Sequence, residues 1–357
     1  MSSIEQLHTV GQSIWIDNIT RDLLDDGTIA RYITHFGVSG LTSNPSIFEK
    51  AVANSKAYDK ALVSADERGL STEDAFFSVA IDDLRRAADL FAPIHEATDG
   101  IDGWVSLEVS PLLADNAQDT IDAAISLFAR AERKNLYIKI PGTSAGIRAI
   151  EAVIAAGVPV NVTLLFSTEQ YLEAAKAYYR GIERRIHEGL DPRVQSVASL
   201  FISRWDVAVN DRVPADLHNQ LGICVGRSTY AAFRDLLASS WVAGLVAKGA
   251  PVQRLLFAST GMKDPSARDT LYVEALAAED TVNTMPDNTL LAFADHGEVS
   301  VGLEALQREA AERLAQIAEH IDLPELAERL LDEGKRSFIS SWELLLNSVS
   351  TKVDTSS

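Results

Sequence analysis

The chain has 357 residues, 46% of them apolar, which is enough for one large hydrophobic core or two ordinary ones. Its formal net charge of −19 at pH 7 repels nucleic acid and anionic lipid, so neither is an expected partner. The N-terminus lacks a secretory signal pattern, no apolar run approaches the ~20 residues that cross a bilayer, and the lone Cys224 excludes an internal disulfide. A cytoplasmic protein without a membrane span is therefore expected.

Eight short apolar runs alternate with longer segments of helical period, a pattern typical of βα units and a parallel sheet. In chain order the runs span residues 13–18, 40–45, 103–110, 135–142, 159–167, 196–204, 254–261 and 280–286. An α/β barrel takes ~250 residues and accepts long insertions, so eight units predict a (β/α)8 TIM barrel. The alternative is an open doubly wound sheet, which the absence of a Gly-rich dinucleotide turn disfavours.

The segments between the runs carry helix signals. Ser71 begins an amphipathic run, and Ser167 with Gln170 forms a capping-box pattern. Helical segments are expected, in chain order, over residues 71–95, 116–134, 167–188, 228–246, 302–320, 324–331 and 335–349. The last three predict packed helices over residues 300–357. No linker rich in Pro, Gly or Ser interrupts the chain, so residues 1–357 are expected to form a single domain.

Nearly every apolar run ends in a residue that can donate, accept or titrate. A barrel gathers the carboxyl ends of its strands at one mouth, so these side chains are expected to converge there. They are Asp17, Asn44, Glu108, Lys139, Thr163, Arg204, Ser259 and Asn283.

Lys139 lies between Ile138 and Ile140 on a predicted strand, an environment that disfavours the charged ammonium group. A neutral amine attacks ketone carbonyls and forms an iminium, which acts as an electron sink for breaking a neighbouring C–C bond. The alternative is a lysine at a strand end whose amine reaches solvent.

Two carboxylates, Asp17 and Glu108, interrupt apolar runs, where they are costly unless they face a polar cavity. Amine catalysis on a sugar needs such a group to move protons. For Asp17 the alternative is a cap on the following helix.

Asn44, Asn161 and Thr163 offer neutral hydrogen bonds to sugar hydroxyls or a catalytic water, whereas Arg204 and Lys263 are the cations expected to bind a phosphate. Each has an ordinary structural alternative: Asn44 as a turn residue, Thr163 as a β-former and Lys263 as an exposed surface lysine.

The motifs WIDNITRDLL, GLTSNPSIFEKAV, SLEVSP, YIKIPGT, VNVTLLFS, SVASLFISR, ASTGMKDP and DTVNTMPDNTLLAFADHG together resemble those of transaldolase, in the family's order from residue 13 to residue 297. The sequence is similar to the longer bacterial subfamily. The resemblance implies a transferase of the pentose phosphate pathway with sugar-phosphate substrates and no cofactor or metal. It would transfer a dihydroxyacetone unit through a Schiff base from sedoheptulose 7-phosphate to glyceraldehyde 3-phosphate, giving erythrose 4-phosphate and fructose 6-phosphate.

The same resemblance implies roles for individual residues. Lys139 matches the Schiff-base lysine, Glu108 the acid/base glutamate and Asp17 the catalytic aspartate. Residues implied to bind substrate are Asn44, Asn161, Thr163, Ser199, Phe201 and Arg204. Ser259 and Lys263 are expected to join them, because they lie at and after the end of the seventh apolar run. The sequence departs from the family at Lys263, where the shorter enzymes carry an arginine. It also diverges over residues 213–230, and this divergence bears on the preference for the acceptor sugar.

Three other functions stay open. A related fructose 6-phosphate aldolase would release free dihydroxyacetone, although its members carry an amide near the position of Glu108 and a tyrosine near that of Phe201. A metal-dependent aldolase needs clustered histidines, and the seven here are scattered. A non-catalytic sugar-phosphate-binding barrel would need the fold without the amine. Either a monomer or a homodimer is compatible with the sequence.

Overall fold

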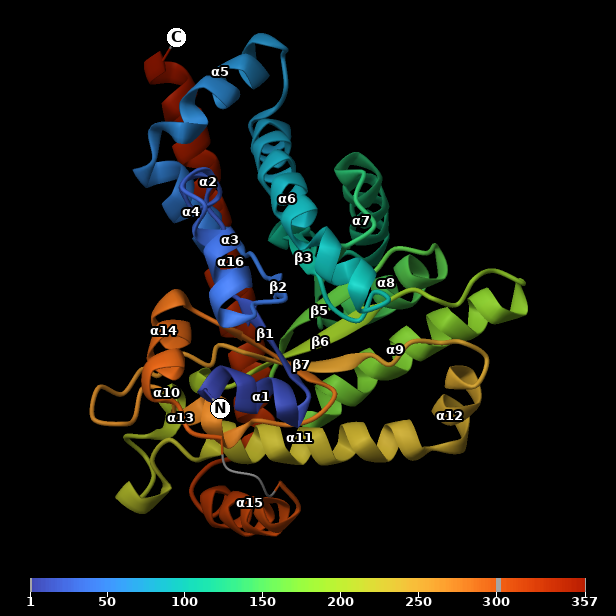
Figure 1. Ribbon diagram of the computed structural model, residues 1–357, viewed down its shortest axis with the longest axis vertical. Coiled ribbons are helices and arrows are strands. Elements are labelled where there is room, and N and C mark those ends of the chain that lie inside the picture. Colours follow the sequence, from blue (N-terminus) through green and yellow to red (C-terminus); the bar gives the residue numbers. More distant parts are fainter. Residues whose placement is uncertain (1, 300–302, 357) are drawn as a thin grey trace.

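Eight parallel strands close into a barrel in which each strand pairs with its sequence neighbours and β1 pairs with β8 (Figure 1). The computed structural model describes residues 2–299 and 303–356, with side chains for residues 2–299 and 308–355. Each predicted apolar run contains one strand, which confirms the (β/α)8 barrel over the open sheet. The strands are β1 (Gln12–Ile16), β2 (Gly40–Leu41), β3 (Trp104–Glu108), β4 (Leu136–Pro141), β5 (Val160–Leu165), β6 (Ser196–Phe201), β7 (Arg254–Ala258) and β8 (Thr281–Met285).

Helices surround the barrel and fill its long connections (Figure 1). Three predicted helix starts are confirmed, because Ser71 and Asn116 cap α6 and α7, and Ser167 with Gln170 forms the capping box of α9. The α-helices are α1 (Ser3–Val10), α2 (Arg21–Asp25), α3 (Thr28–Phe36), α4 (Pro45–Asn54), α5 (Asp59–Glu67), α6 (Thr72–Ala97), α7 (Ala117–Ala131), α8 (Ser144–Ala155), α9 (Thr168–His187), α10 (Ser203–Val209), α11 (Leu221–Ala238), α12 (Ser240–Val246), α13 (Leu271–Ala275), α14 (Asp287–His296), α15 (Leu303–Ala318) and α16 (Leu323–Ser356). None of the described helices is long and apolar enough to span a bilayer.

Aromatic side chains fill the amino-terminal half of the barrel interior. The rings of Trp104 and Tyr137 stack with centroids 4.1 Å apart, and Trp15 lies 6.1 Å from Tyr137. A Cβ atom at Gly40 would lie 2.6 Å from the Trp15 indole, so β2 approaches this ring only because it carries no side chain there. The stack leaves the opposite half of the barrel as the place for a cavity.

The predicted helix over residues 228–246 is wrong in its bounds. Helix α11 starts earlier, at Leu221, because the Asp206 carboxylate accepts the backbone N–H groups of Leu221 and Gly222. It ends at Ala238, and the next residue, Ser239, caps α12 because its Oγ atom accepts the N–H of Val242. The divergent segment is thus fixed by a buried carboxylate.

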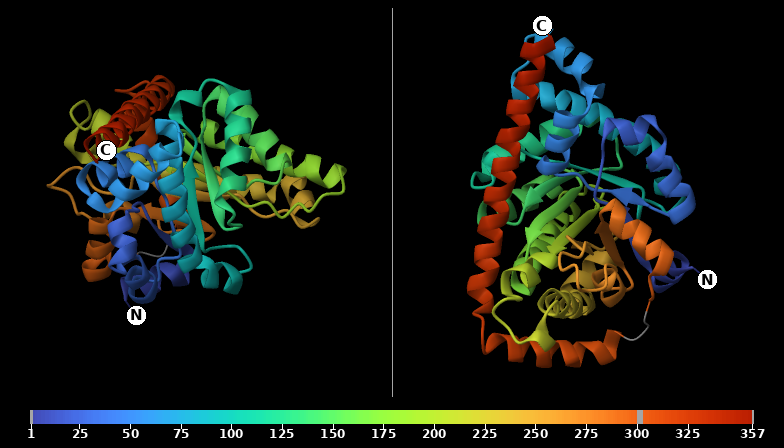
Figure 2. Two further views of the ribbon diagram at one scale, coloured as in Figure 1. Left: turned by 90° about the horizontal axis from the view of Figure 1, so that it is seen from above. Right: turned by 90° about the vertical axis from the view of Figure 1, so that its left-hand side faces the viewer.

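The C-terminal helices that the sequence predicts are present, but the last two form one helix. The part of the 302–320 prediction before residue 303 lies outside the described residues. The predicted segments 324–331 and 335–349 are joined in α16, which runs along one side of the molecule from α15 to α5 (Figure 2). A glycine inside a helix usually weakens it, but Gly334 faces Leu164 so closely that an added Cβ atom would lie 2.9 Å from the leucine Cδ2. Packing therefore selects the glycine.

Candidate active site

Lys139 and Glu108 are register partners on adjacent strands near the carboxyl end of the barrel. Their side chains are 6% and 8% exposed, and Lys139 Nζ lies 3.3 Å from Glu108 Oε2. The contact is an ion pair without a directed hydrogen bond, and Glu108 Oε2 has no hydrogen-bond donor among the described residues. Lys139 Nζ instead donates a 2.8 Å hydrogen bond to the Ser43 carbonyl. The alternative of a lysine reaching bulk solvent is therefore wrong.

Burial raises the pKa of Glu108 to about 7, although the nearby Lys139 opposes the shift. The carboxyl group can thus both accept and donate a proton near neutral pH. Burial also raises the pKa of Asp17, again against the charge of Lys139. Two carboxylic acids and one amine therefore influence one another at the end of β1, β3 and β4, as proton transfer around a Schiff base requires.

Asp17 follows the last residue of β1 and accepts a 2.7 Å hydrogen bond from Thr42 Oγ1. Thr42 is also 2.8 Å from Thr284 Oγ1, so a chain of hydroxyl groups from β2 and β8 fixes the Asp17 carboxylate. The alternative role of Asp17 as a helix cap is wrong, because Thr20 caps α2. Neither threonine was singled out from the sequence.

A cavity of about 720 Å³ opens at this end of the barrel. Most of the residues that the sequence predicted for the site line it. They are Asp17, Asn44, Lys139, Thr163, Ser199, Phe201, Arg204, Ser259 and Lys263. Glu108 does not line the cavity but contacts Lys139, which does.

The neutral polar residues take three different positions. Thr163 Oγ1 is buried and makes no hydrogen bond to any described residue, so it can serve a bound hydroxyl or water. Asn44 lines the cavity and also caps α4, where its side chain accepts the Ile47 N–H. Asn161 does not line the cavity. It lies beneath it, where its Oδ1 accepts a 2.7 Å hydrogen bond from Ser199 Oγ.

The cations lie toward the outer part of the cavity. Arg204 belongs to the first turn of α10 and not to the end of β6, which stops at Phe201. Its guanidinium Cζ lies 5.5 Å from the centroid of the Phe201 ring, and burial lowers the pKa of Arg204. Lys263 is exposed in the loop after β7, and Lys50 of α4 is a third cation that the sequence analysis missed. These groups can hold an anion at the mouth of the cavity.

The C-terminal helix completes the cavity wall. Leu330, Glu333 and Phe338 of α16 line the cavity opposite the strand ends. Leu330 and Phe338 fall in the predicted helical segments 324–331 and 335–349, Glu333 lies between the two segments, and none of the three is assigned to the site from the sequence. Helical periodicity identifies a buried face without showing which neighbour that face meets.

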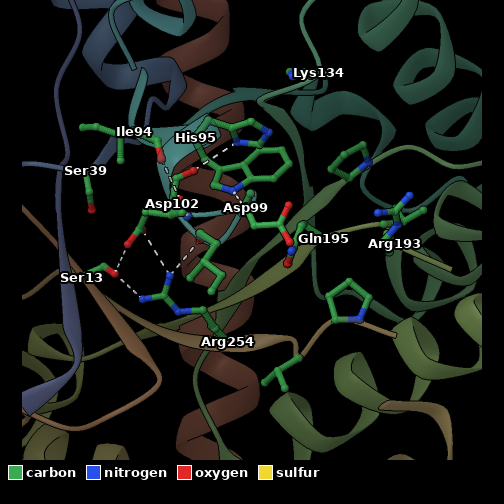
Figure 3. A pocket seen from close by; sticks show the side chains of 18 of the residues that line it. Ser13, Ser39, Ile94, His95, Asp99, Asp102, Lys134, Arg193, Gln195 and Arg254 are labelled. Carbon is green, nitrogen blue, oxygen red and sulfur yellow. Dashed lines mark hydrogen bonds and ion pairs between the residues drawn. The ribbon is translucent and has the colours of Figure 1, made fainter. Parts of the chain in front are cut away.

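A larger concavity, of about 1340 Å³, lies at the amino-terminal end of the barrel (Figure 3). Its central charges satisfy one another. The Asp102 carboxylate accepts hydrogen bonds from Ser13 Oγ at 2.6 Å, Trp15 Nε1 at 3.1 Å and the Arg254 guanidinium at 3.2 Å. These charged groups are paired with one another and stabilise the closed barrel at this end. The cavity around Lys139, at the other end, is therefore the candidate active site. No group of three His, Cys, Asp or Glu side chains in the described part of the chain is arranged to hold a metal ion.

The sequence is similar to known proteins over nearly its whole length. Residues 14–349 match the family described as transaldolase/fructose-6-phosphate aldolase. The chain is 42% identical to a transaldolase of Mycolicibacterium smegmatis, over 99% of this chain and 98% of the relative. It is also 42% identical to a transaldolase of Neisseria gonorrhoeae, over 97% and 99%, and 39% identical to transaldolase 2 of a Nostoc species, over 98% and 97%. The chain belongs to the transaldolase/fructose-6-phosphate aldolase family.

Proposed function

We propose that this chain is a transaldolase, which transfers a dihydroxyacetone unit from a ketose phosphate such as sedoheptulose 7-phosphate to an aldose phosphate such as glyceraldehyde 3-phosphate. The products are erythrose 4-phosphate and fructose 6-phosphate, in the pentose phosphate pathway. The observation that carries the proposal is the buried Lys139 amine, 3.3 Å from a carboxyl group whose pKa is about 7.

In the proposed first step, Lys139 transfers a proton to Glu108, and the neutral amine attacks the donor ketone. Glu108 then returns the proton to the carbinolamine oxygen, water leaves, and an iminium forms. No outside oxidant or reductant takes part.

The iminium draws the electrons of the adjacent C–C bond, and Asp17 takes the proton of the hydroxyl group on the departing carbon. The bound enamine then attacks the aldehyde of the acceptor, which regains a proton from Asp17. Hydrolysis of the new iminium frees the product and restores Lys139.

The cations have a binding role in the proposal. Arg204 and Lys263 hold the phosphate, with Phe201 against the guanidinium. Ser199, Ser259, Asn44 and Thr163 bind hydroxyl groups or water, and Asn161 fixes Ser199 from below. We also propose that residues 1–357 form a single domain, because α16 lines the same cavity as the strand ends, and that this domain is cytoplasmic.

Borohydride trapping tests the proposal. The wild-type chain incubated with fructose 6-phosphate and borohydride should gain a three- or six-carbon adduct on Lys139, and a coupled assay should show transfer to an aldose phosphate. Lys139→Met should retain its fold by circular dichroism and gain no adduct. Full turnover by Lys139→Met would refute the mechanism.

A second function, fructose 6-phosphate aldolase, is favoured by the family match alone, which covers both activities. It differs in releasing free dihydroxyacetone. Incubating the donor without an acceptor separates the two, because a transaldolase releases little dihydroxyacetone until an aldehyde is added. Steady release at the rate of transfer would support the aldolase. A non-catalytic binding barrel would gain no adduct at all.

A further inference from the structure

A carboxylate lies on the cavity wall beside the predicted phosphate site. Glu333 of α16 lines the same cavity as Arg204, and its charge raises the pKa of the Arg204 guanidinium against the effect of burial. The residue after it, Gly334, approaches the guanidinium so closely that an added Cβ atom would lie 3.6 Å from Arg204 Nη1. Helix α16 therefore brings a negative charge next to a cation that binds an anion.

The two side chains influence each other through space only. Arg204 forms no ion pair with a carboxylate in the described ranges 2–299 and 308–355, and the Glu333 side chain is held by Arg329, whose Nε lies 3.5 Å from Glu333 Oε1. The Arg204 guanidinium is positioned by the Phe201 ring and the passing helix instead. Removing the charge of Glu333 should therefore leave the geometry of Arg204 in place.

We propose that Glu333 is a specificity-determining residue, which weakens the binding of phosphate at Arg204 by electrostatic repulsion. A phosphate dianion beside Arg204 would share the cavity with the Glu333 carboxylate, and like charges repel one another even where solvent partly screens them. The carboxylate thus limits how tightly phosphorylated substrates, products and free phosphate bind. The inference rests on the proposed function, because it takes Arg204 as the residue that meets the phosphate.

The chain provides a matched control in the neighbouring residue. The Asp332 side chain is 58% exposed and that of Glu333 is 56% exposed, so both substitutions remove one surface charge from the same turn. Asp332 instead lies 3.8 Å from both Lys335 and Arg336, and it does not line the cavity. Comparing Glu333→Gln with Asp332→Asn separates a local effect from a change in net charge.

The experiment measures competitive inhibition of the full-length enzyme by inorganic phosphate, together with KM for a phosphorylated and an unphosphorylated ketose donor. At low salt we expect Glu333→Gln to lower the inhibition constant of phosphate by about fivefold, the order expected for one partly screened charge on the wall of the same cavity. KM for the phosphorylated donor should fall in parallel, and KM for the unphosphorylated donor should stay the same. The difference should shrink near 1 M salt, where the Debye length is about 3 Å.

Equal inhibition constants in Glu333→Gln and Asp332→Asn would overturn the inference, and so would weaker phosphate binding by Glu333→Gln, which would mean that the carboxylate positions Arg204. Failure of the proposed function is distinguishable from both results. In that case the wild-type chain would form no Schiff base and transfer no carbon unit, whatever its affinity for phosphate.

Discussion

Glu108 lies beside Lys139 because the two residues are paired across adjacent parallel strands, with the carboxyl Oε2 atom 3.3 Å from the amine. Strand register alone therefore fixes the distance between the proposed nucleophile and its proton acceptor.

The pH dependence of activity should follow Glu108. Burial raises the pKa of this carboxyl group to about 7, so below pH 7 it is mostly protonated and cannot accept a proton from Lys139. We expect kcat/KM to fall about tenfold for each pH unit below 7. Glu108→Gln should lower kcat by about 10²- to 10³-fold and abolish this inflection. A mutant profile that keeps an inflection near pH 7 would assign the titration to another group.

Asp17 should act after the Schiff base forms. Asp17→Asn keeps an oxygen that can accept from Thr42 but cannot take the hydroxyl proton, so C–C cleavage should slow by about 10²- to 10³-fold. Borohydride should still trap the donor ketose on Lys139 at close to the wild-type rate. Mass spectrometry of the trapped protein checks both the trapping and the slowed C–C cleavage, because the mutant adduct should retain all of the donor carbons. Loss of trapping would place Asp17 in the earlier step.

Gly334 should tolerate no side chain, although alanine favours a helix. The new Cβ atom would lie 2.9 Å from Leu164 Cδ2, and overpacking of this kind costs about 1 to 3 kcal/mol. That cost exceeds the gain of about 1 kcal/mol from helix propensity. Gly334→Ala should therefore lower Tm and raise KM for phosphorylated donors. Gly244 of α12 is the control, because nothing lies within 4 Å of a Cβ atom there and Gly244→Ala should raise Tm. Equal shifts of Tm in the two variants would contradict a close contact between position 334 and Leu164.

The amino-terminal end of the barrel should affect stability and not chemistry. Asp102→Ala removes the acceptor of three donors and leaves the partly buried Arg254 without its carboxylate, which we expect to cost about 3 kcal/mol. Chemical denaturation measures this cost. Asp191→Ala, which breaks an exposed pair with Arg193, is the control and should change little. A drop in kcat without a drop in stability would give Asp102 a role in the active site.

The barrel and most of the residues around the cavity could be predicted, because each strand lies in its own apolar run and that run carries a polar residue near its carboxyl end. Lys139 and Asp17 stand out as charges in apolar surroundings. Ser43 could not be found this way, since it contributes its backbone carbonyl to Lys139, and no side chain signals that. Thr42 is one of many hydroxyl residues, and its contact with Asp17 depends on the pairing of β1 and β2.

Residues on helices were harder to assign to the site. Lys50 and Glu333 reach the cavity through the rotation of α4 and α16 about their own axes, which tertiary packing decides. Arg204 was found by its motif although it lies in a helix and not at a strand end. The continuity of α16 through Gly334 was also hidden, because the contact with Leu164 that selects a glycine comes from a distant part of the sequence.

Helix α16 connects two environments, since Phe338 lines the cavity while Trp342, one turn later, packs edge-on against Phe76 with centroids 5.2 Å apart. A residue inserted between them would turn everything beyond it by about 100°. The Trp342 indole would then lose its contact with Phe76, although the residues of α16 that line the cavity would be unchanged. Changes in length within this stretch are thus constrained from both ends, and natural variation there should consist of substitutions.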